Sequence, residues 1–233
     1  MERKLLKTVT AVAFLVVPLI SQADISDSTT FGTIQGNPNG GNPYSGTGIP
    51  YNASEITTIS GLPGSDSLTL ALSATAHGDS NPSPANDGNG TFTVDTGLAG
   101  GRSLWNFDFW ISAANGSLSP YTFTLTETGN GQTFTFFPTL IPDNVGAPGS
   151  AGNSESLDFA VFGVPIDYNP NQDDTYTFTL TASEGRTQLG SDSITVNSVP
   201  EPTTVVAGAM LLLPLGFGAL RTLRNRKAAA SVN

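Results

Sequence analysis

Residue types that could do chemistry are sparse in this chain of 233 residues. Its one histidine, His77, stands in an Ala-His-Gly-Asp-Ser stretch in which Asp79 is the nearest acid. A serine hydrolase needs a histidine that an acid orients and that lies within reach of a nucleophile. The same composition is typical of a solvated loop, and we expect His77 to be a loop residue.

Paired carboxylates are the second chemistry to consider, because glycosidases use two acids that face one cleft. Asp108 and Asp158 each stand in the polar phase of an alternating aromatic segment. That phase points away from the apolar face of a strand, so we expect both acids to face solvent. Soft-metal sites are excluded, since the chain has no cysteine and one histidine. We therefore expect no enzyme active site.

Calcium is the one cofactor that the composition allows, because Ca²⁺ takes oxygen ligands from Asp, Asn and backbone carbonyls. Two segments, 86–90 and 171–174, have this composition, although neither has the spacing of a D-x-D-x-D-G loop. Asn, Asp and Gly are also the residues that β-turns select, so plain turns remain the alternative. The candidate ligands are Asp87, Asn89, Asp173 and Asp174.

Apolar and polar residues alternate with a period of two in many short segments between residues 68 and 196. This pattern predicts strands with one apolar and one polar face, separated by Gly, Asn, Pro and Asp clusters. We predict an all-β fold, an immunoglobulin-like or jelly-roll-like antiparallel β-sandwich over residues 24–198. Segments 31–51 and 77–90 are expected to be long loops. The expected core residues are Phe107, Phe109, Phe123, Phe159, Tyr176, Phe178 and Leu180.

One aromatic residue breaks the alternation. Trp110 stands in the polar phase of a segment whose apolar phase holds Trp105, Phe107 and Phe109. An aromatic ring exposed in a shallow groove would suit carbohydrate binding, which makes Trp110 a candidate glycan contact. Packing of Trp110 beneath a loop is the alternative.

The N-terminus has the three parts of a secretory signal peptide. A basic start with Arg3, Lys4 and Lys7 precedes an apolar run at 9–20, which is 12 residues and too short to span a membrane comfortably. Small residues follow, and we expect cleavage between Ala23 and Asp24. An uncleaved N-terminal anchor is the alternative.

The sequence of the C-terminus is typical of a sorting tail. Residues 203–220 form an uncharged apolar run of 18 residues, about 27 Å as a helix, which matches the hydrocarbon thickness of a bilayer. Cations after this run would stay in the cytoplasm under the positive-inside rule. Before the run stand Val199, Pro200, Glu201 and Pro202; after it stand Arg221, Arg224, Arg226 and Lys227.

Together these two ends resemble the PEP-CTERM family of exported bacterial proteins. The resemblance implies a Gram-negative cell, recognition of Pro200, Glu201 and Pro202 by an exosortase, and removal of the hydrophobic tail. It implies that signal peptidase, exosortase and the inner membrane are partners, in a cell-surface or exopolysaccharide setting. Segments within 121–182 also resemble a sandwich domain that recurs in this family without an assigned activity.

The net charge of the chain bears on which partners it can bind. The exported part at 24–198 holds two cations and 17 acids, a net charge of −15, which disfavours nucleic acid as a partner. We expect a non-enzymatic structural or binding module, exported and associated with exopolysaccharide or biofilm. A secreted, glycan-directed hydrolase is the alternative.

Overall fold

The computed structural model describes residues 24–35, 43–44, 49–77, 83–141, 146, 148–157 and 168–200. These residues form 13 β-strands and two short 3₁₀ turns, η1 (Pro63–Ser65) and η2 (Pro138–Leu140), so the described chain is all-β. Within these ranges no helix has the length and apolar character that a membrane crossing requires. The expected signal peptide and the expected span at 203–220 lie outside the described residues.

Five strands form the first sheet, in the order β1-β2-β3-β8-β11, and every neighbouring pair is antiparallel. In β8 the alternation places Phe107 and Phe109 on the inner face, as the sequence predicts. The strands are β1 (Ser26–Gly32), β2 (Ser54–Ser60), β3 (Leu68–Ala76), β8 (Trp105–Ala113) and β11 (Ser150–Ser156).

Six strands form the second sheet, in the order β10-β9-β12-β13-β5-β4. A two-residue turn at Asn130 and Gly131, both with positive φ, joins β9 to β10, which is the usual geometry for a tight hairpin. The strands are β4 (Ala85–Asn86), β5 (Thr91–Asp95), β9 (Thr122–Gly129), β10 (Gln132–Phe136), β12 (Asp174–Glu184) and β13 (Thr187–Val199). A separate small hairpin joins β6 (Leu98–Ala99) to β7 (Arg102–Ser103).

The expectation of purely antiparallel pairing is corrected at one position. β13 is antiparallel to β12 but parallel to β5, with Val199 opposite Asp95. A parallel pair needs a long connection, and here residues 96–186 lie between the two strands. Short strands also occupy parts of the two expected loops, since β1 reaches Gly32 and β4 covers Ala85–Asn86.

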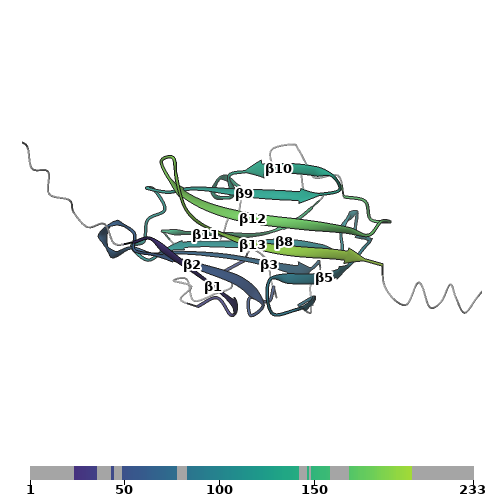
Figure 1. Cartoon of the computed structure of the whole chain (residues 1–233). Coiled ribbons are helices and arrows are strands. Elements are labelled where there is room, and N and C mark those ends of the chain that lie inside the picture. Colours follow the sequence, from purple (N-terminus) through teal and green to yellow (C-terminus); the bar gives the residue numbers. More distant parts are fainter. Residues whose placement is uncertain are drawn as a thin grey trace, which may run out of the picture.

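The two sheets pack face to face as a β-sandwich, with β13 lying against β2 and β3 (Figure 1). The ring of Phe107 stacks on that of Phe178 across the interior, with the ring centroids 4.8 Å apart. The ring centroids of Trp105 and Tyr176 are 5.4 Å apart. Of the expected core residues, Phe107, Phe109, Phe123, Tyr176, Phe178 and Leu180 are all buried, and Phe159 lies outside the described residues.

Trp110 is buried, with 1% of its surface exposed. It packs on the outer face of the first sheet with Ile34, Tyr44 and Ile49, which come from the segment expected to be a free loop. Of the two alternatives for Trp110, the structure therefore shows packing beneath a loop. Its proposed glycan contact is corrected, because the covering segment leaves no ring surface for a sugar.

Candidate functional site

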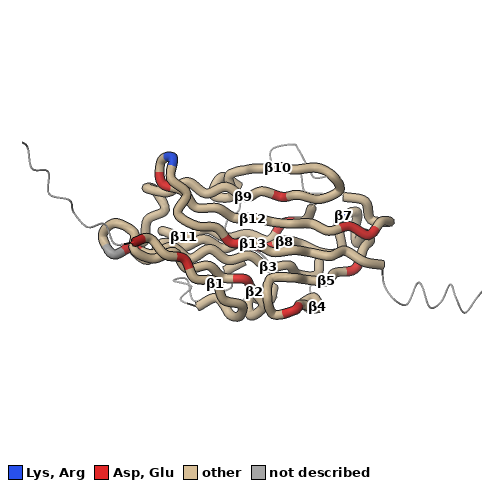
Figure 2. The backbone as a smooth tube through the Cα atoms, in the orientation of Figure 1, with Lys and Arg blue, Asp and Glu red and all other residues tan. Residues whose placement is uncertain are grey.

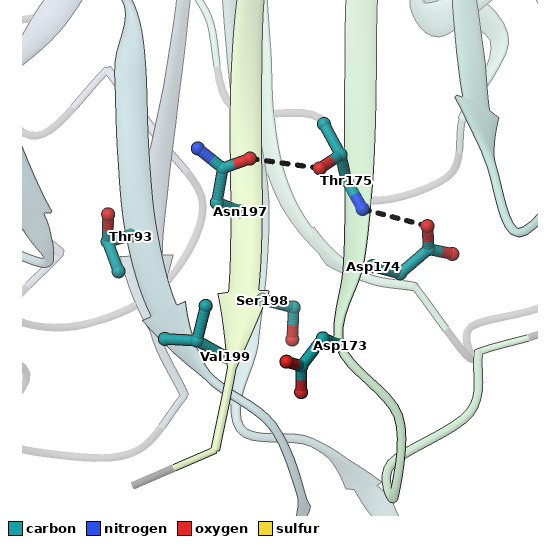
Figure 3. Close-up of a pocket in the computed structure, with 7 residues that line it drawn as sticks. All are labelled: Thr93, Asp173, Asp174, Thr175, Asn197, Ser198 and Val199. Atoms are coloured by element: carbon teal, nitrogen blue, oxygen red, sulfur yellow. Dashed lines mark hydrogen bonds between the residues drawn. The ribbon is translucent and has the colours of Figure 1, made fainter. Parts of the chain in front are cut away.

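A hollow of about 580 Å³ lies where β13 ends, beside Val199. Its lining comes from the start of β12, the end of β13 and the middle of β5 (Figure 3). The register brings Asp174 opposite Ser198 and Thr175 opposite Asn197. The hollow thus unites Asp173 and Asp174, two of the expected calcium ligands, with Val199, the first residue of the expected sorting motif.

Hydrogen bonds fix part of this lining. The Thr175 hydroxyl donates to Asn197 Oδ1 at 3.0 Å, and the backbone N–H of Thr175 donates to Asp174 Oδ1 at 2.8 Å. Two buried oxygens have no hydrogen-bond partner, Asp174 Oδ2 and Ser198 Oγ. Figure 3 shows the Ser198 hydroxyl and the Asp173 carboxylate pointing toward one another across the hollow.

The chemistry of this lining is that of an oxygen-donor site. It contains carboxylates, hydroxyls and one amide, and it contains no histidine. Among the described residues, no group of three or more His, Asp or Glu side chains has the geometry to hold a metal ion. The hollow can therefore bind a polar group or a hydrated cation, but it does not form a closed metal cage.

The other two expected calcium ligands, Asp87 and Asn89, lie in the turn between β4 and β5, away from the hollow. Asp87 Oδ1 accepts the backbone N–H groups of Thr91 at 3.0 Å and of Asn89 at 2.8 Å. These bonds hold the pKa of Asp87 below its ordinary value, with the Thr91 bond the larger cause. Turn formation accounts for the composition of this segment.

A second hollow of about 500 Å³ shares Thr93 and Val199 with the first, and His77 and Trp105 also line it. The imidazole Nδ1 of His77 lies 3.1 Å from Asn106 Oδ1, and its backbone N–H donates to the Leu104 carbonyl at 2.7 Å. His77 is thus half-buried, and among the described residues its ring is held by an amide. Asp79 lies outside the described residues.

Acidic residues occur within the strands as well as at both ends of the sandwich (Figure 2). Asp108 is the clearest case, because it is fully buried although the sequence predicted a solvent-facing acid. The covering segment that contains Tyr44 closes over this part of the outer face, which corrects the expectation. The Thr75 hydroxyl donates to Asp108 Oδ1 at 3.3 Å, whereas Oδ2 has no partner.

Burial raises the pKa of Asp108 to about 8, and hydrogen bonds from Ser154 and Thr75 offset only part of this rise. Asp108 is therefore a neutral carboxylic acid at pH 7. Burial, followed by the charge of Asp108, also raises the pKa of Tyr44, whose hydroxyl lies 2.8 Å from Ser54 Oγ. This cluster fastens the covering segment to the sheet.

A third group of acids lies between the sheets. Glu127 of β9 shares the inward phase of Phe123 and Leu125, and Glu155 of β11 is opposite the inward-facing Phe107. Burial, and then the charge of Glu155, raises the pKa of Glu127 to about 8. Asn153 Nδ2 donates to Glu155 Oε1 at 2.8 Å, which orients the Glu155 carboxylate.

Comparison of the chain with protein-family models, with curated proteins and with solved structures gives no match. The assignment of a function therefore depends on the residues themselves. Of the expected processing residues, Val199 ends β13, and Pro200 and Asp24 are exposed. Outside the described residues lie Ala23, Glu201, Pro202, Arg221, Arg224, Arg226 and Lys227.

Proposed function

We propose that this chain is an exported surface or extracellular-matrix protein whose sandwich is a non-enzymatic structural or binding module. In this proposal a signal peptidase cuts between Ala23 and Asp24, and an exosortase recognises Pro200, Glu201 and Pro202. Residues 203–220 anchor the chain in the inner membrane until the tail is removed. The processed protein is then located at the surface of a Gram-negative cell, in association with exopolysaccharide. The immunoglobulin-like or jelly-roll-like type of the sandwich belongs to the same proposal.

One observation supports this function above the others: the sandwich ends where the sorting motif begins. Val199 is the last residue of β13 and pairs with Asp95, and its carbonyl accepts the Thr96 N–H at 2.9 Å. Pro200 follows at once and is exposed. Because proline has a fixed φ and disfavours helix in the residue before it, Glu201 is expected to be extended. A cut after Val199 would leave every strand of the sandwich intact.

The surroundings of the motif fit a substrate better than an enzyme. The hollow beside Val199 has oxygen donors but no histidine, and the ring of His77 contacts an amide. Without cysteine the domain depends on packing alone, which suits a protein that must fold outside the cell without disulfide formation.

Intact-mass analysis of protein exported from a host with and without an exosortase tests this proposal. We expect a mature form that begins at Asp24 and lacks residues 203–220 only when the exosortase is present. Glu201→Gln should block tail removal, whereas the matched variant Glu184→Gln, at the exposed end of β12, should be processed normally. A mature form that always keeps residues 203–220 would show that the span is a permanent anchor.

A glycan-directed hydrolase remains a second candidate, favoured by the Glu127 and Glu155 pair. A glutamate with a raised pKa beside a second glutamate is an arrangement that glycosidases use, and the charge of Glu155 is one cause of the raised pKa of Glu127. Both side chains are buried, with 5% and 8% exposed, which argues against substrate access. Release of reducing ends from exopolysaccharide by the wild type but not by Glu127→Gln would favour the hydrolase.

A further inference from the structure

A second pair of interior acids lies between the two sheets, with one acid on each sheet. Glu55 lies on β2 and Asp192 lies on β13, and the two strands contact one another across the interior. Each follows the inward phase of its strand, Glu55 with Ile59 and Asp192 with Ile194. Asp192 is 1% exposed and Glu55 is 9% exposed, and their charges interact.

Both acids have an oxygen without a partner. Glu55 Oε2 and Asp192 Oδ2 are buried and accept no hydrogen bond. Asp192 Oδ1 accepts the Thr57 hydroxyl at 3.0 Å, so the side chain is oriented while its second oxygen stays available. Leaving such oxygens uncompensated in the interior is costly, and two adjacent carboxylates add their mutual repulsion.

The Ser193 carbonyl oxygen lies near the Glu55 carboxylate, beside Gly90. A Cβ atom on Gly90 would lie 3.3 Å from Glu55 Oε2 and 3.4 Å from the Ser193 carbonyl oxygen. The glycine therefore leaves room where a carboxylate and a carbonyl approach each other. Asp87 lies nearby and adds a further negative charge that acts on Glu55.

Protein cations do not supply the compensation that these acids need. The exported part contains two, Arg102 and Arg186. Arg102 belongs to the separate β6–β7 hairpin, and Arg186 is exposed in the turn between β12 and β13. A small cation from solution is the remaining source of positive charge, and the strongly acidic domain raises its local concentration.

We propose that Glu55 and Asp192, with the Thr57 hydroxyl and the Ser193 carbonyl, bind a calcium ion that fastens the first sheet to the second. All of these donors are oxygens, which suits a hard cation and disfavours zinc or copper. Ca²⁺ accepts irregular arrangements of six to eight oxygens, including waters, whereas Mg²⁺ requires a near-ideal octahedron. Two carboxylates completed by neutral oxygens are typical of a weak extracellular site, with a Kd of roughly 10⁻⁴–10⁻³ M.

This site differs from the calcium ligands that the sequence predicts. Residues 55, 57, 192 and 193 come from two distant parts of the chain, and the packing of one sheet against the other brings them together. Asp173 and Asp174 lie in the hollow at the end of β13, which gives a matched acidic control on the same protein.

The test uses the full chain in detergent, stripped with EDTA and titrated with CaCl₂ by calorimetry and thermal unfolding. The wild type should bind one Ca²⁺ and unfold at a higher temperature when calcium is present. Asp192→Asn and Glu55→Gln should each weaken calcium affinity at least tenfold. Asp173→Asn should bind calcium like the wild type.

Two results would overturn the site. Calcium that neither binds the wild type nor raises its unfolding temperature would mean that Glu55 and Asp192 are simply buried neutral acids. Binding that survives both Asp192→Asn and Glu55→Gln but is lost in Asp173→Asn would place the ion in the hollow instead. Should Asp192→Asn fail to fold, Glu55→Gln decides alone, because circular dichroism and unfolding in EDTA report its fold independently of calcium.

Discussion

Substitution of Asp108 by asparagine should remove a large part of the pH dependence of stability. Asp108 is fully buried, and its pKa rises from 3.8 to about 8 on folding. A raised pKa means that the folded state keeps a proton that the unfolded state loses. The contribution is therefore most favourable at low pH and is lost progressively as the pH rises from about 4 to about 8.

The magnitude follows from the linkage between protonation and folding. Each pH unit in this window changes the free energy of unfolding by about 1.4 kcal/mol for one such group. Between pH 5 and pH 8 the wild type should lose about 4 kcal/mol through Asp108 alone, an upper value for an order-of-magnitude pKa. The asparagine side chain of the variant cannot ionise. The free energy of unfolding of the variant should therefore rise relative to that of the wild type by this amount over the same pH range.

Urea unfolding at pH 5, 6.5 and 8 measures the effect as the difference between variant and wild type. Glu127 adds its own pH dependence to both proteins, and the subtraction removes it. Asp95→Asn is the matched control, because it makes the same substitution at an exposed position, the end of β5. A variant that follows the wild-type slope, or that is less stable at pH 8, would show that Asp108 is ionised in the folded protein.

Three further predictions concern packing and topology. Phe178→Ala should lower the free energy of unfolding by about 3–5 kcal/mol in urea, since Phe178 is fully buried and stacks on Phe107. Gly129→Ala should destabilise by about 1–3 kcal/mol in the same assay, because a Cβ there would overlap the ring of Tyr176. Reporter fusions after Pro200 and after Ala229 should report opposite sides of the inner membrane, and the same side for both would refute the topology.

The alternation of residues was enough to predict the sandwich and its core, because a strand places every second side chain on the same face. It also contained a signal for the interior acids. Glu127 follows Phe123 and Leu125 in the same phase, and Asp192 precedes Ile194 and Val196 in theirs. An acid in the apolar phase of a strand is evidence for a buried carboxyl group. The sequence does not reveal which of these acids face each other, since that depends on how the sheets pair.

Asp108 could not have been predicted in this way. It occupies the polar phase of β8, as a solvent-facing acid would, and it is buried only because Tyr44, Ile34 and Ile49 cover the outer face. This burial changes how the charge of the domain should be read. With pKa values near 8, Asp108 and Glu127 hold their protons at pH 7, so the net charge of the exported part is nearer −13 than −15. Alkaline conditions would restore both charges in the interior, and the domain should therefore be most stable in mildly acidic surroundings.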